Sequence, residues 1–137
     1  MKNNQSSLSY TQKLTKLTQI LTLREDITLS LLFGSRARGD NNEQSDWDIA
    51  ILFKDNSCAW DNLGKLEEIR HLISLALEAN NGDIDLVDLY RGGLGINATV
   101  VDEGIPLTGT SSIDLAYYYQ RIWANLEDFY WNVEHVS

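Results

Sequence analysis

An α/β fold is predicted by the order in which apolar patterns alternate along this sequence. Segments with apolar residues at three-four spacing indicate helices, and the short continuous apolar runs between them have the length of buried strands. A chain of 137 residues is long enough for one core and too short for two. We therefore expect residues 1–137 to form a single domain with helices packed on a sheet.

The first predicted helix begins after Ser9, which forms a capping-box pattern with Gln12, and runs to about Leu23. Its apolar residues lie on one helical face, as expected for a helix that packs on a sheet. The other predicted elements are a strand at 27–33, a helical turn at 36–39, a strand at about 46–53, a helix at about 60–79, a strand at 83–89, a short helix at 97–103, a small edge strand at 104–107 containing Pro106, and a last helix at about 112–133.

Three finer predictions concern single positions in these elements. Trp60 belongs to the three-four pattern of the long middle helix, so it is predicted to lie in the core. The residues at 80–82, Asn-Asn-Gly, tolerate positive φ and are predicted to end that helix. Ser111 and Ser112 are predicted to cap the last helix.

The most informative stretch is residues 31–53, which reads as strand, polar loop and strand. Asp46 and Asp48 are two residues apart at the start of the second strand, so both project from the same face, with Trp47 behind them. Paired carboxylates repel each other unless a cation lies between them, and hard oxygen ligands suit Mg²⁺ or Mn²⁺. A metal site is predicted here, although Asp-x-Asp at a strand start is often simply solvated.

The turn before the polar loop has the composition of a phosphate-binding segment. Gly34 lets the backbone approach a ligand, and Ser35 can cap a following helical turn, which would direct N–H groups and a hydroxyl at a nucleotide phosphate. Arg36 and Arg38 are second-rank candidates for contact with triphosphate oxygens. The alternative is an ordinary glycine-serine turn with surface arginines.

A later strand is unusually rich in carboxylates. Asp83 and Asp85 project from one face of the predicted strand at 83–89, and Asp88 projects from the other. Burying such a strand is costly unless the charges are neutralised, which a metal at the neighbouring strand would do. The carboxylates of this strand are therefore expected to lie near the predicted metal site.

These motifs carry a resemblance to a known family. Gly34-Ser35, ten intervening residues and Asp46-Trp47-Asp48 resemble the G-S-x(about ten)-D-x-D signature of nucleotidyltransferases related to DNA polymerase beta. The segments GSRARG, SDWDIAILF and DIDLVDL are similar to those of the minimal nucleotidyltransferases, including the MntA-type antitoxins of HEPN-MNT toxin-antitoxin pairs. The resemblance implies a small mixed sheet flanked by helices.

The resemblance also implies an active site. Asp46 and Asp48 would hold two divalent ions, Mg²⁺ or Mn²⁺, and Asp85 would ligate the second ion as the third catalytic residue, with Asp83 in reserve. Gly34 and Ser35 would hold the triphosphate of ATP. The implied reaction is transfer of AMP to a tyrosine of a HEPN ribonuclease toxin, with which the chain would form a hetero-oligomer. The alternatives are transfer to a small-molecule hydroxyl, such as that of an aminoglycoside, and a non-catalytic antitoxin that acts by occlusion.

The composition limits which classes of partner are expected. Eleven basic and twenty acidic residues give a formal charge of −9, which opposes binding to nucleic acid. An acidic surface could attract a basic protein or could serve solubility alone. No apolar run approaches the length of a membrane span, so no membrane role is expected. The polar N-terminus and the single Cys58 favour a cytoplasmic location.

The last predicted helix carries more aromatic residues than one buried stripe accommodates. Exposed tryptophan and tyrosine side chains are frequent anchors in protein interfaces. We therefore expect Trp123, Tyr130 or Trp131 to contact a partner or a second copy, the alternative being that all three pack inside.

Overall fold

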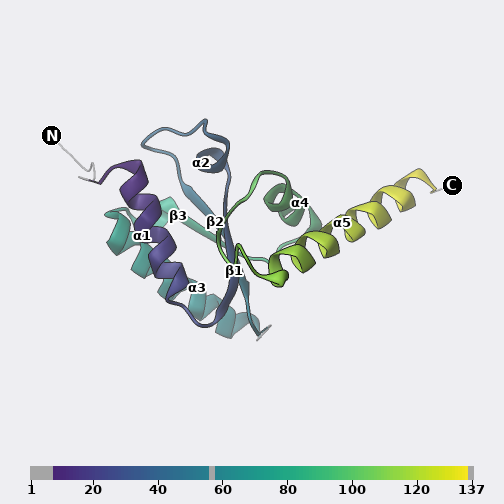
Figure 1. The fold of residues 1–137 in the computed structure, drawn as a ribbon, viewed down its shortest axis with the longest axis horizontal. Coiled ribbons are helices and arrows are strands. Elements are labelled where there is room, and N and C mark those ends of the chain that lie inside the picture. The colour runs from purple at the N-terminus through teal and green to yellow at the C-terminus, as the bar shows by residue number, and fades with distance from the viewer. Residues whose placement is uncertain (1–7, 56–57, 136–137) are drawn as a thin grey trace.

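A four-stranded sheet with helices on both faces forms the body of the protein, and one long helix extends from it (Figure 1). The computed structural model describes residues 8–55 and 58–135. Its elements are α1 (Tyr10–Thr22), β1 (Ile27–Phe33), α2 (Ser35–Arg38), β2 (Trp47–Phe53), α3 (Ala59–Leu77), the 3₁₀ helix η1 (Asn81–Asp83), β3 (Ile84–Asp88), α4 (Leu94–Glu103), β4 (Ile105–Thr108) and α5 (Ile113–Glu134).

The sheet is mixed, which confirms the predicted fold class. Its strand order is β3-β2-β1-β4. Strand β1 is antiparallel to both β2 and β4, whereas β2 and β3 are parallel and are connected through α3. Strand β4 forms one edge, so Pro106 lies where a missing N–H is tolerated, as expected.

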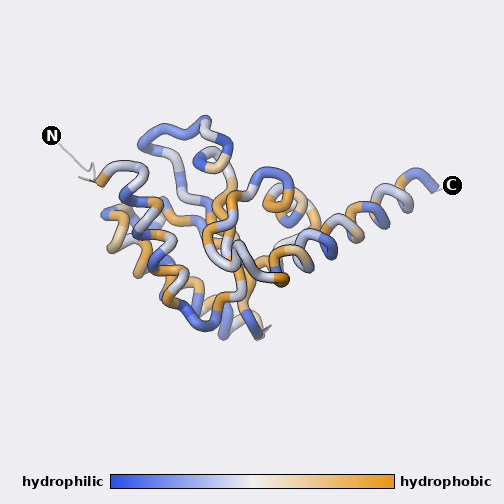
Figure 2. The backbone as a smooth tube through the Cα atoms, in the orientation of Figure 1, coloured by the Kyte–Doolittle hydropathy of each residue, from blue (hydrophilic) through white to orange (hydrophobic). Residues whose placement is uncertain are grey.

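The central strands of the sheet are buried on both faces, because an apolar layer covers each face. Helices α1 and α3 cover the face that carries Ile49 and Ile51, and α4 and α5 cover the face that carries Ala50 and Leu52. Figure 2 shows the hydrophobic colour concentrated along the central strands and the inner sides of these helices. The alternation places Asp48 on the α4/α5 face, because it is two residues before Ala50.

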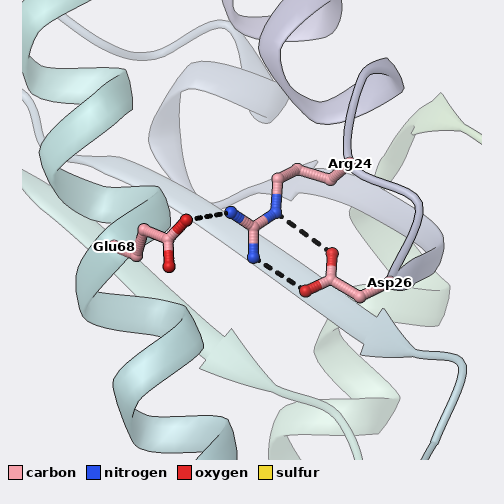
Figure 3. Close-up of polar contacts among 3 residues, drawn as sticks. All are labelled: Arg24, Asp26 and Glu68. Atoms are coloured by element: carbon pink, nitrogen blue, oxygen red, sulfur yellow. Dashed lines mark hydrogen bonds and ion pairs between the residues drawn. The ribbon is translucent and has the colours of Figure 1, made fainter.

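The turn between α1 and β1 is tied to α3 by charged groups. Arg24 Nε and Nη2 donate to the two carboxylate oxygens of Asp26 at 3.1 and 2.7 Å, and Nη1 donates to Glu68 of α3 at 2.7 Å (Figure 3). The bidentate geometry sets the direction in which the chain enters β1. It therefore helps to position the strand that ends at Gly34.

The start of α1 matches its prediction, because Ser9 and Gln12 form the capping box. The prediction for Trp60 is wrong, since this side chain is 80% exposed. The buried stripe of α3 consists of residues 62, 66, 69, 73 and 77, and position 60 lies on the opposite side of the helix. Asn62 occupies the first inward position instead.

Some helix ends and caps differ from the predicted ones. The left-handed residue that ends α3 is Glu78, with φ of 55°, and the Asn-Asn-Gly segment leads into η1 instead. Helix α4 begins at Leu94, earlier than expected. Ser112 is the N-cap residue of α5, but its hydroxyl donates to Gly109 O at 2.8 Å and does not cap the helix.

None of the helices in residues 8–55 and 58–135 combines the length and the apolar character that a membrane span requires.

Candidate active site

The turn after β1 is shaped by close contact with a carboxylate. Gly34 has φ of 76° and ψ of −159°, a conformation that side chains rarely adopt. A Cβ atom at this position would overlap Asp48 Oδ2, because Phe33 and Asp48 are register partners in the antiparallel β1–β2 pair. The backbone of the glycine-serine turn therefore lies directly against the Asp48 carboxylate.

Ser35 is the first residue of α2, and Gly34 is its N-cap. The predicted role of Ser35 as the capping side chain is therefore wrong. Ser35 is instead a partly exposed residue at the start of this helical turn. The helix is a single turn, closed by hydrogen bonds from Ala37 N and Arg38 N to Gly34 O at 3.1 and 3.0 Å.

Two carboxylates from parallel strands are brought together beside this turn. Asp48 of β2 and Asp85 of β3 are direct register partners, and both lie on the α4/α5 face of the sheet. Burial raises the pKa of Asp48 to about 6, and the charges of Asp85 and Asp46 together with a hydrogen bond to Asp85 add to this rise. The electrostatics therefore disfavour a charged Asp48 unless a cation is nearby.

Asp46 lies just before β2 and is exposed. It is close enough to raise the pKa of Asp48 and also to interact with the guanidinium of Arg36. Among the described residues, no three His, Cys, Asp or Glu side chains already form a cage that could hold a metal ion. The donor set nevertheless fits a hard divalent cation, because Asp48 and Asp85 are register partners and the charge of the exposed Asp46 acts on Asp48.

The two arginines of the turn have different positions. Arg36 is only 7% exposed, lies over the Trp47 ring at 4.2 Å and donates from Nε and Nη2 to Ser45 O at 3.2 and 2.9 Å. Tyr10 stacks on Trp47 with 5.6 Å between ring centroids, and its hydroxyl donates to Arg36 O at 3.2 Å. Arg36 therefore braces α2 against the start of β2 from behind the carboxylates.

Arg38 is exposed. It pairs with Asp40 at 3.2 Å and with Glu103 at the end of α4 at 2.9 Å. Its charge also lowers the pKa of Asp48 slightly against the larger upward effects. The charge of Arg38 thus acts on Asp48, whereas that of Arg36 acts on Asp46.

Asp83 and Asp85 lie in different surroundings. Asp83 ends η1 and lines a cavity of 910 Å³ on the α1/α3 side, together with Tyr10 and Arg36. This cavity is lined by none of Asp46, Asp48 and Asp85. The carboxylate at position 85, not the one at 83, faces Asp48.

Asp88 is neutralised without a metal, contrary to the expectation for this carboxylate-rich strand. Its Oδ2 accepts from Asn62 Nδ2 and from Arg91 Nη1, both at 2.9 Å, and its Oδ1 accepts from Tyr90 N at 2.9 Å. The spacing of Asp88 and Arg91 was the available sequence signal for this pair. The network anchors the chain that leaves β3 to α3.

A mixed sheet that places a glycine-serine turn against paired strand carboxylates is the arrangement of a nucleotidyltransferase. The family described as polymerase beta nucleotidyltransferase matches residues 15–112, and the chain belongs to this family. The predicted resemblance is confirmed.

Two relatives within this family share the name protein adenylyltransferase MntA. The relative from Shewanella oneidensis is 36% identical over 106 residues, which cover 75% of this chain and 71% of that protein. The relative from Aphanizomenon flos-aquae is 29% identical over 107 residues, covering 76% and 71%. A solved structure of a toxin-antitoxin with AMP-PNP has a similar fold, with a TM-score of 0.69, 26% identity, and coverage of 88% of this chain and 90% of that one.

Proposed function

We propose that this chain is an antitoxin that transfers AMP from ATP to a tyrosine of a HEPN-family toxin encoded beside it, and thereby silences the toxin. The observation that carries the proposal is the pairing of Asp48 with Asp85 against the Gly34 turn. The 36% identical relative named protein adenylyltransferase MntA supports a protein acceptor. The relatedness to a toxin-antitoxin structure with AMP-PNP supports ATP and a toxin partner.

The proposal includes two divalent ions, Mg²⁺ or Mn²⁺, held by Asp46, Asp48 and Asp85. The charges of Asp46 and Asp85 raise the pKa of Asp48, so the three carboxylates are a donor set that a hard cation would stabilise. When bound, the ions would supply charge neutralisation at the triphosphate and at the attacking oxygen. Chelation of divalent ions is expected to abolish both ATP binding and transfer.

The chain's own residues would orient the reactants. Gly34 and Ser35 would hold the triphosphate, because their turn lies beside the carboxylate at position 48, where a bound cation would attract the phosphates. Arg38 is exposed and its charge acts on Asp48, so it is the candidate contact for the phosphates, whereas Arg36 acts from behind as a brace. The bound α-phosphorus would then lie over the paired strands β2 and β3.

The acceptor hydroxyl forms the new bond to the α-phosphorus as the bond to the β-phosphate oxygen breaks and pyrophosphate leaves. A tyrosine hydroxyl, with a pKa of about 10, is mostly protonated at neutral pH and must lose its proton during the reaction. Asp85 is exposed beside Asp48, so its carboxylate is the group placed to accept this proton.

The direct experiment mixes the protein, labelled ATP, Mg²⁺ and the HEPN-family protein encoded beside it, and maps the adduct by mass spectrometry. An AMP adduct on a toxin tyrosine is expected, and the Asp46→Asn/Asp48→Asn variant should produce none while remaining folded. Full inhibition of the toxin without an adduct would favour occlusion, and an adduct only on added aminoglycosides would favour a small-molecule enzyme. Absence of any neighbouring HEPN-family protein would also overturn the proposal.

The choice between the two acidic residues before and within β3 is tested by matched variants. Asp85→Asn should retain ATP binding but lose transfer, because this carboxylate pairs with Asp48. Asp83→Asn should be much milder, because Asp83 lies at the cavity on the other side. Radiolabel transfer and nucleotide titration, measured on both variants, separate the two steps. Equal loss of transfer in both would remove the assignment of Asp85.

A further inference from the structure

Helix α5 carries a continuous apolar seam with coiled-coil spacing. Its members alternate at intervals of four and three residues over most of the helix. This α5 seam consists of Leu115, Tyr119, Ile122, Leu126, Phe129 and Val133.

The two halves of the α5 seam have different surroundings. Leu115, Tyr119 and Leu126 pack on the core with Ile122, which is 4% exposed. Beyond Leu126 the helix extends away from the sheet (Figure 1), and apolar residues continue along it (Figure 2). Phe129 and Val133 are 50% and 58% exposed. The same stripe that is buried in the first half is therefore uncovered in the second.

We propose that this uncovered half, with Phe129, Tyr130 and Val133 as anchors, inserts into an apolar groove between helices of the partner toxin; this rests on the proposed function. The seam spacing suits knobs-into-holes packing against another helix, and Tyr130 lies beside the seam and is 60% exposed. Trp131 is equally exposed but points away from the seam, so it is not an anchor.

Charge favours a toxin over a second copy of this chain as the molecule that covers this half of the seam. Glu127, Asp128 and Glu134 are exposed on the second half of α5, and residues 122–135 contain no Lys or Arg. Pairing two such helices would bring two acidic segments together on chains that each have a net charge of −9. A groove with a basic rim is complementary. The occupant is thus a basic-rimmed helical surface, and the isolated chain is expected to be monomeric.

The test measures binding of the purified HEPN-family protein encoded beside this chain, without ATP, so that binding is separated from transfer. The variant Phe129→Ser/Val133→Ser should bind at least about tenfold more weakly, as expected for loss of central anchors. Trp131→Ser removes an aromatic residue of similar exposure from the opposite side and should change the affinity less than about twofold. Both variants should melt at the wild-type temperature, because neither site packs on the core.

Each outcome has one interpretation. Wild-type affinity in the double variant, or an equal loss in Trp131→Ser, would overturn the α5 assignment. Sedimentation of the chain alone as a dimer that the double substitution dissociates would assign the surface to a second copy. Failure of the proposed function looks different, since wild-type protein would then bind the toxin through α5 but transfer no AMP. The variant Asp48→Asn should bind normally and transfer nothing.

Discussion

Asp48 is the residue at which burial, like charge and backbone geometry meet. Its carboxylate touches the Gly34 backbone, pairs with Asp85 across β2–β3 and feels the charge of Asp46. Holding the Asp48 carboxylate in this environment lowers the free energy of unfolding when the carboxylate is charged. Such a cost is common at functional sites, where perturbed pKa values cluster.

Replacing Asp48 by Asn should stabilise the protein in the absence of divalent ions, more at high pH than at low pH. The folded-state pKa of about 6 lies above the reference value of 3.8, so the folded state retains a proton that the unfolded state loses. Wild-type stability therefore falls as pH rises through this interval, and the variant avoids that loss. Thermal melts in EDTA should show a gain at pH 8 that shrinks toward pH 5.

The exposed Asp55, at the other end of β2, provides the control for this series. Asp55→Asn should shift the melting temperature little at either pH. A stabilising effect of Asp48→Asn that is independent of pH would contradict the electrostatic account.

Gly34 should be far less replaceable than Gly39, although both have positive φ. A Cβ at position 34 would overlap Asp48 Oδ2, whereas a Cβ at position 39 meets nothing within 4 Å. Gly39→Ala should cost only the strain of the left-handed conformation, about 1 kcal/mol. Gly34→Ala should cost about 3 kcal/mol or more and displace Asp48. Urea denaturation and AMP transfer measure the two effects, and similar costs would refute the contact.

At the scale of elements, α5 is anchored through one buried polar network. Tyr118 OH donates to Asn97 Oδ1 at 2.6 Å, and Asn97 Nδ2 donates to the carbonyls of Gly92 and Gly93 at 3.1 and 3.0 Å. The contact joins α5 to α4 and to the loop that follows β3. It therefore connects the proposed docking helix to the strand that carries Asp85.

Tyr118→Phe should destabilise the fold by about 1–3 kcal/mol, because Asn97 Oδ1 would be buried without its donor. Tyr119→Phe is the matched control, since this neighbouring ring is partly buried and its stacking on Trp123 survives the change. Denaturant unfolding of both variants is the measurement. Equal stability of Tyr118→Phe and wild type would show that the hydroxyl contributes little.

Across the whole molecule, charge and shape both bear on how the proposed basic-rimmed partner would bind. The net charge of −9 acts over the whole surface, and the extended half of α5 exposes Phe129 and Val133. Association of such a pair is expected to be fast at low salt.

Raising NaCl from 50 to 500 mM should slow association with the HEPN-family protein several-fold and leave dissociation nearly unchanged, because salt screens long-range attraction more than apolar packing. Surface-immobilised binding kinetics provide the two rates. An association rate independent of salt would argue that the acidic balance serves solubility alone.

Local sequence patterns were enough to predict the alternation of helices and strands, the Gly34-Ser35 turn and the candidate carboxylates. These features depend on local spacing: capping at Ser9, apolar strand runs, and residues two apart on one face. The resemblance of these motifs also predicted the nucleotidyltransferase family.

Which side chains face one another depends on how the elements pack, and local patterns do not contain this information. Only the parallel register of β2 and β3 opposes Asp85 to Asp48, while η1 directs Asp83 elsewhere. Burial of Arg36 on Trp47, exposure of Trp60 and the uncovered half of the α5 seam depend on what packs against each surface. Spacing along a chain gives the direction of a side chain relative to its own element, whereas contact requires the position of a second element.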